Sequence, residues 1–121
     1  MATAVIGVVG VCFLVMGLYG LVAPAALARP FGIPIETPES RSEIRAVYGG
    51  FGVAIAGLLA AAAFDVGGIR TGAVIAVAAA LAGMAFGRVV SRMVDRAVPF
   101  YPIWFYFGIE LVAAGLLWAA A

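Results

Sequence analysis

Glu110 is the residue whose type and position most strongly suggest chemistry, because it is the one acid inside a long apolar segment, residues 102–121. If that segment is helical, Glu110 lies about 12 Å along it, near the middle of a membrane. A charge at that depth costs several kcal/mol unless it is paired, protonated or hydrated. Two kinds of role therefore stay open: a structural bond to an arginine or a tyrosine, and a proton or ligand site.

Arg88 is the natural partner of Glu110, because it lies near the end of the apolar segment 71–90. Antiparallel neighbouring helices would bring the two side chains together. Arg88 also begins a run of polar residues at helical spacing, and a second polar group opens the apolar segment 44–64 at the same end of the predicted bundle. The candidate ligand or ion-pair residues are Arg45, Tyr48, Arg88, Ser91, Asp95 and Glu110.

A simpler explanation accounts for most of the aromatic residues at this end. Tyrosine, tryptophan and arginine gather at membrane interfaces, where long basic side chains reach toward water. This explanation fits Arg45, Arg88 and Glu110 less well, because they lie deeper than an interface requires.

Several classes of site are excluded by composition. The chain has no histidine and one cysteine, Cys12, which excludes the usual catalytic triads, an internal disulfide and cysteine or histidine metal sites. No metal and no cofactor are therefore expected, and neither is enzymatic activity. A net charge of +1 argues against a nucleic-acid partner, which favours a basic surface.

Four apolar segments of about 20 residues could position these side chains, at residues 3–23, 44–64, 71–90 and 102–121. Only 11% of the chain is charged, against about 25% in a soluble domain. Apolar runs of this length in lipid must be helices, since the backbone has to satisfy its own hydrogen bonds. We predict an all-α fold, an integral membrane bundle of four transmembrane helices forming one domain, residues 1–121. The first segment lacks a basic region before it and is predicted to be a retained helix.

The connections agree with this count. Pro30, Pro34 and Pro38 interrupt the stretch after the first segment. Residues 25–28 are expected to form a short helix at the interface. Ser40 and Glu43 have the spacing of a capping box before the second span.

Small residues at four-residue spacing predict close helix contacts, either inside one bundle or between two copies of the chain. One such stripe contains Gly83 and Gly87, and another contains Gly50. The glycines expected at helix contacts are Gly49, Gly50, Gly83 and Gly87.

The arginines predict an orientation. One side of the membrane would hold most of them, Arg29, Arg41, Arg45, Arg92 and Arg96, while Arg70 lies on the other. The positive-inside rule then places the arginine-rich loops in the cytoplasm and both termini outside, in the inner (plasma) membrane.

Three short motifs carry a resemblance to a known family: Glu43-Ile-Arg45-Ala-Val-Tyr48-Gly49-Gly50, Gly87-Arg88 followed by Ser91 and Asp95, and Glu110-Leu111. Over essentially its whole length the chain resembles the bacterial membrane family catalogued as domain of unknown function 4345. The family usually has glycine where this chain has Arg96. The resemblance implies a small four-helix membrane protein and implies no reaction.

Three functions remain in competition. The first is a small non-catalytic protein, an accessory or assembly subunit in contact with membrane lipids, acting as a homo-oligomer or within a larger membrane complex. The second is a small proton-coupled transporter or exporter that uses Glu110. The third is a lipid- or quinone-binding protein whose site lies near Arg45, Tyr48 and Arg88.

Overall fold

The computed structural model describes all 121 residues, and every regular element is helical. Four helices are long and apolar enough to cross a membrane. They are α1 (Ala2–Val22), the continuous helix Pro38–Ala63, α5 (Arg70–Val94) and α6 (Ile103–Ala120). The predicted fold class, an all-α membrane bundle of four helices, is confirmed. The second helix begins six residues before the predicted span 44–64, and α5 continues four residues beyond the predicted end at residue 90.

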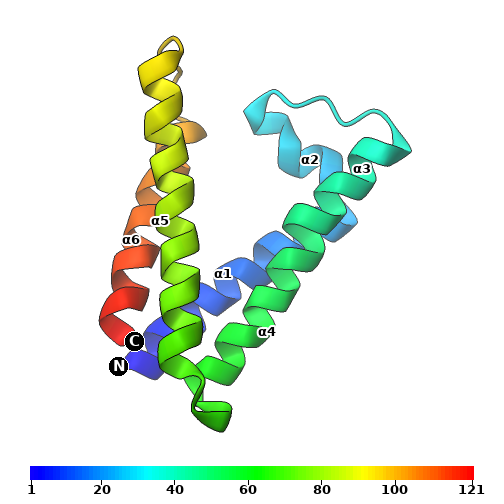
Figure 1. Ribbon diagram of the computed structural model, residues 1–121. Helices are drawn as coiled ribbons and strands as arrows, with labels where there is room; N and C mark the ends of the chain where they lie inside the picture. Colours follow the sequence, from blue (N-terminus) through cyan, green and yellow to red (C-terminus); the bar gives the residue numbers. More distant parts are fainter.

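The four helices form two pairs that diverge like the arms of a V (Figure 1). One pair is α1 with α4 (Phe51–Ala63), the last part of the second long helix, and the other is α5 with α6. The arms meet at the end that holds both chain termini and the α4–α5 turn, which we call the closed end. Each helix contributes one large, fully buried side chain there: Ile6, Leu59, Val74 and Leu117. The hydrophobic core therefore joins the two pairs at the closed end.

Arg70 adds polar contacts at the closed end. Its Nε donates to the carbonyl of Ala62 at 3.0 Å, and its Nη2 donates to the carbonyl of Ala63 and to Thr3 Oγ1. Thr3 in turn donates to the Ala63 carbonyl at 3.0 Å. Carbonyls in the last turn of a helix have no partner within the helix. Arg70 satisfies two of them in α4 and links α1, α4 and α5.

Glycines bring α1 and the second long helix into backbone contact. A Cβ atom added to Gly17 would lie 2.6 Å from the nitrogen of Val53, and one added to Gly52 would lie 2.8 Å from the Cα of Gly17. Gly49 is buried in the same contact, against Leu21. Because lipid gives apolar helices little reason to associate, such close approach is a main source of helix packing in membranes.

The other three glycines expected at helix contacts do not pack against a neighbouring helix. A Cβ added to Gly83 or Gly87 would meet no atom within 4 Å, and one added to Gly50 would approach only the carbonyl of Arg45 in its own helix. The expectation that these three glycines pack helices inside the bundle is wrong. Small residues are so frequent in this chain that four-residue spacing alone does not identify a contact.

The second long helix contains a π-helical segment, η2 (Arg45–Gly50), between α3 (Pro38–Ile44) and α4. It includes Gly49 and Gly50, and the contact with α1 runs along it. Arg45 Nε donates at 3.0 Å to the carbonyl of Leu21, in the last turn of α1. This contact and the glycines hold the α1–α4 arm together at its far end, away from the core.

The remaining connections are short. After a break at Ala23, the expected short helix is α2 (Pro24–Ala28), followed by the 3-10 turn η1 (Arg29–Phe31). The predicted capping box at Ser40 and Glu43 is wrong, because the helix begins earlier. Thr37 is the cap, and the Thr37 and Ser40 side chains accept from each other's backbone N–H at 3.1 Å. A second 3-10 turn, η3 (Val66–Gly68), joins α4 to α5.

Candidate functional site

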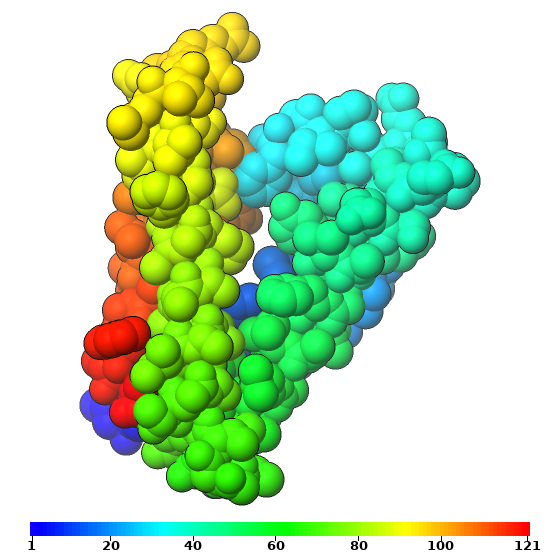
Figure 2. Space-filling view, viewed as in Figure 1, coloured from blue at the N-terminus to red at the C-terminus, as the bar shows by residue number.

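A cavity of about 490 Å³ lies between the two arms at the end away from the core, which we call the open end. Twelve of its eighteen lining residues are hydrophobic. The space-filling view shows an opening between the second long helix and α5 through which part of α1 is visible (Figure 2). Pockets for small molecules commonly have volumes of about 300–1,000 Å³, so the cavity has the size of a ligand site and an opening on the side of the bundle.

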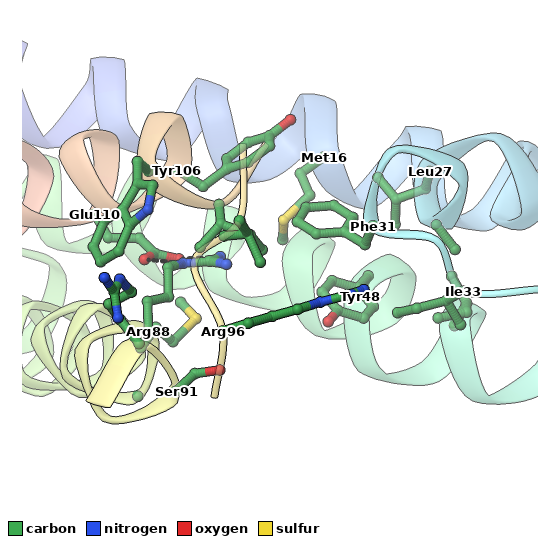
Figure 3. A pocket seen from close by; sticks show the side chains of 18 residues that line it. Met16, Leu27, Phe31, Ile33, Tyr48, Arg88, Ser91, Arg96, Tyr106 and Glu110 are labelled. Atoms are coloured by element: carbon green, nitrogen blue, oxygen red, sulfur yellow. Dashed lines mark hydrogen bonds and ion pairs between the residues drawn. The ribbon is translucent and has the colours of Figure 1, made fainter. Parts of the chain in front are cut away.

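Each arm contributes one wall of the cavity, and the segment between α1 and α3 covers part of it. Met16 comes from α1 and Met84 from α5, while Leu27 and Phe31 come from α2 and η1. Phe31 reaches the opposite arm, since its ring centroid lies 5.5 Å from that of Tyr106 on α6. Figure 3 shows the labelled apolar side chains on the side of the cavity away from Glu110.

Arg88 and Glu110 form an ion pair at the wall made by α5 and α6. Arg88 Nε donates to Oε1 of Glu110 at 2.8 Å, and Arg88 Nη2 donates to Oε2 at 2.9 Å. The side chains are 22% and 8% exposed, respectively. The two parallel bonds are the planar, bidentate geometry that favours arginine over lysine. Both carboxylate oxygens are therefore engaged, and further N–H groups of Arg88 remain for other acceptors.

Two more arginines line the end of the cavity that lies next to the α5–α6 loop. We call this end of the cavity the mouth. Arg92 lies in the last turn of α5 and Arg96 in the following loop. Both are exposed, and neither takes part in a salt bridge, because the Arg88–Glu110 pair is the only one in the chain. In Figure 3 the side chain of Arg96 extends from the loop toward Tyr48. Three guanidinium groups and one carboxylate leave the lining with a net charge of +2.

The structure brings four of the predicted site residues to the cavity: Tyr48, Arg88, Ser91 and Glu110. It places two elsewhere. Arg45 binds the Leu21 carbonyl of α1, and Asp95 Oδ1 accepts from the backbone N–H of Arg96 at 2.8 Å. Arg45 and Tyr48 both lie in the π-helical segment, and only Tyr48 lines the cavity.

Other lining residues were not among the predicted site residues. Arg92 belongs to the helical stripe of polar residues that begins at Arg88, whereas Arg96 lies beyond the helix. Leu27 and Phe31 have the four-residue spacing of one helix face. That they cover a cavity depends on how the segment after Ala23 folds back, and no local pattern indicates it.

The arrangement suits binding of an amphiphile. Its apolar wall and side opening match a lipophilic molecule, and its mouth carries positive charge. Nowhere in the chain do three or more histidine, cysteine, aspartate or glutamate side chains gather as they would around a metal ion. Cys12 lies on α1, exposed and outside the cavity lining.

Comparison with known proteins agrees with the resemblance in the motifs. No curated protein and no solved structure shows a significant match to the chain. The family described as "Domain of unknown function (DUF4345)" matches residues 1–121, the full length of the sequence. The chain therefore belongs to the DUF4345 family, as an all-helical membrane protein with a cavity between two helix pairs.

Proposed function

We propose that this protein is a non-catalytic membrane protein that binds a lipophilic molecule between its two helix pairs. The observation that carries the proposal is the cavity of about 490 Å³, lined mainly by apolar side chains and open between the second long helix and α5. Because these helices would face lipid, a molecule dissolved in the bilayer can enter through that opening without crossing water. The cavity favours this hypothesis over the accessory subunit, which stays a prediction.

The state of Glu110 also bears on the transporter hypothesis. A proton-coupled carrier needs a carboxylate that gains and loses a proton during its cycle, whereas both oxygens of Glu110 accept hydrogen bonds from Arg88. Protonation would have to break a bidentate ion pair inside the membrane, where an arginine without its partner is costly. This favours a structural role for the pair and a binding role for the cavity.

We place the protein in a bacterial inner membrane with the cavity on the cytoplasmic side and both termini outside. The arginine distribution supports this orientation, since Arg70 lies at the closed end, whereas five arginines lie toward the open end: Arg29, Arg41, Arg45, Arg92 and Arg96. The ligand would then come from the inner leaflet. Labelling of single cysteines at either end in intact cells tests the orientation, and an accessible open end contradicts it.

The chain's own tryptophans provide a test of binding. Trp104 lines the cavity, whereas Trp118 is exposed near the other end of the same helix. In a Trp118→Phe variant, fluorescence reports on Trp104 alone. The probes are two single-chain lipids with the same dibrominated chain, a monoacylglycerol and a lysophosphatidic acid, because bromine quenches tryptophan on contact.

A matched pair of variants distinguishes the cavity from bulk lipid. Gly87 and Gly83 lie one turn apart on α5 with open space around each, but only Gly87 lines the cavity. We expect saturable quenching of Trp104 by at least one probe, lost in Gly87→Leu and kept in Gly83→Leu. Quenching that rises only in proportion to probe in the bilayer, alike in both variants, contradicts the proposal.

A further inference from the structure

We propose that the ligand is a single-chain lipid whose headgroup is a phosphate monoester, and that Arg92 and Arg96 bind that phosphate. This inference rests on the proposed function, since it identifies the class of molecule that the cavity takes. It depends on the charge of the lining, on which arginines are free, and on the order of side chains along α5.

The charge of the lining favours a doubly charged headgroup. Arg88, Arg92 and Arg96 outweigh Glu110 and leave a net charge of +2. A phosphate monoester carries a charge of about −1.5 to −2 near neutral pH, whereas a carboxylate carries one negative charge. The guanidinium fork also matches the oxygens of phosphate. Asp95 is the nearest acid in sequence, and its carboxylate bonds to the backbone of Arg96 and does not line the cavity.

Arg92 and Arg96 are the arginines available to an incoming anion. Arg88 is engaged by Glu110 through both Nε and Nη2, and Arg45 is engaged by the Leu21 carbonyl. The side chains of Arg92 and Arg96 have no hydrogen-bond or salt-bridge partner within the chain. A phosphate at the mouth therefore gains charged hydrogen bonds without breaking existing ones, and the remaining N–H groups of Arg88 can add to them.

The order of side chains along α5 orients the ligand. Arg92, Arg88 and Met84 follow one another at four-residue spacing and all line the cavity, so each step inward covers about 6 Å. From the mouth inward, the wall presents first the unpaired Arg92 cation, then the neutralised ion pair of Arg88, and then the apolar thioether of Met84. Met16 and Phe31 add apolar surface from the other arm. A headgroup at the mouth and one hydrocarbon chain directed inward match this sequence.

The experiment compares three lipids with the same dibrominated chain, using quenching of Trp104 in the Trp118→Phe protein. They are a lysophosphatidic acid, the neutral monoacylglycerol and the free fatty acid. The test variant is Arg92→Gln/Arg96→Gln, in which the two replaced arginine side chains have no hydrogen bond or salt bridge within the chain. The control, Arg29→Gln/Arg41→Gln, removes the same charge from the same end but away from this cavity. An Arg92→Lys/Arg96→Lys variant keeps the positive charge and loses the planar, bidentate donor geometry of the guanidinium group.

We expect the lysophosphatidic acid to bind about tenfold or more tightly than the monoacylglycerol, because each charged hydrogen bond contributes substantially to affinity. That preference disappears in the double Gln variant, persists in the control, and is partly kept in the double Lys variant. Equal affinity of the phosphate and neutral lipids overturns this inference and leaves the proposed function standing. A fatty acid that binds as tightly as the phosphate lipid also overturns it. If none of the three lipids quenches Trp104 saturably, the proposed function itself fails.

Discussion

Arg88 and Glu110 are joined by two parallel hydrogen bonds, of 2.8 and 2.9 Å, between helices α5 and α6. Both residues lie within membrane-crossing helices, so each charge neutralises the other where neither would be tolerated alone. The buried hydrophobic core lies at the closed end of the bundle. The ion pair therefore holds α5 and α6 together where the arms diverge, and it forms part of the cavity wall.

Removing one partner of this pair should destabilise the protein more than removing both. Glu110→Leu leaves the Arg88 cation without a partner, and we expect the free energy of unfolding to fall by roughly 3–5 kcal/mol, as for other buried ion pairs. The double variant Arg88→Met/Glu110→Leu removes both charges and should recover most of that loss. Unfolding with sodium dodecyl sulfate in mixed micelles measures both values. A double variant as unstable as the single one would show that the charges do not depend on each other.

Gly17 should tolerate no side chain, because a Cβ there meets the backbone of the partner helix, 2.6 Å from the nitrogen of Val53. We expect Gly17→Ala to lower the free energy of unfolding by about 1–3 kcal/mol, as overpacking does. Gly7→Ala is the control in the same helix, where a Cβ meets nothing within 4 Å. That change should be neutral or stabilise by up to about 1 kcal/mol, since alanine favours helix. Equal effects of the two substitutions in the same unfolding assay would refute the close contact.

Arg70 should hold the closed end together. Arg70→Gln removes the hydrogen bonds to the Ala62 and Ala63 carbonyls and to Thr3. We expect the free energy of unfolding to fall by about 1–3 kcal/mol. We also expect faster hydrogen exchange at the start of α1 and the end of α4. Arg29→Gln replaces an exposed arginine whose side chain donates no hydrogen bond within the chain, and it should leave both measurements unchanged. If exchange in the Arg70→Gln variant rises equally along all four helices, the effect is global and the local role is wrong.

The sequence predicted the fold and the ion pair for the same physical reason. Lipid permits only helices of sufficient length, and it makes a charged Glu110 costly unless the carboxylate is paired, protonated or hydrated. Residue type and depth thus made Arg88 the natural partner among the roles left open for Glu110, and the structure contains that ion pair.

Features that depend on tertiary structure were not predictable in this way. Arg45 donates to the Leu21 carbonyl from the π-helical segment, while Tyr48 of the same segment lines the cavity. Gly83 and Gly87 belong to a stripe of small residues at four-residue spacing and meet no other helix, whereas Gly17, Gly20, Gly49 and Gly52 do meet the backbone of a partner helix. The cavity exists because the arms diverge and Phe31 folds back onto Tyr106. The sequence of a single helix indicates neither the divergence of the arms nor the contact between Phe31 and Tyr106.

Native mass spectrometry of the protein, extracted gently from its own membrane, tests most directly whether the cavity holds a lipophilic ligand. We predict one retained lipid of single-chain mass with a phosphate group, present in the wild type and in Gly83→Leu and absent from Gly87→Leu. A wild-type protein that carries no lipid, or a lipid retained equally when Gly87 is replaced by leucine, would contradict the account.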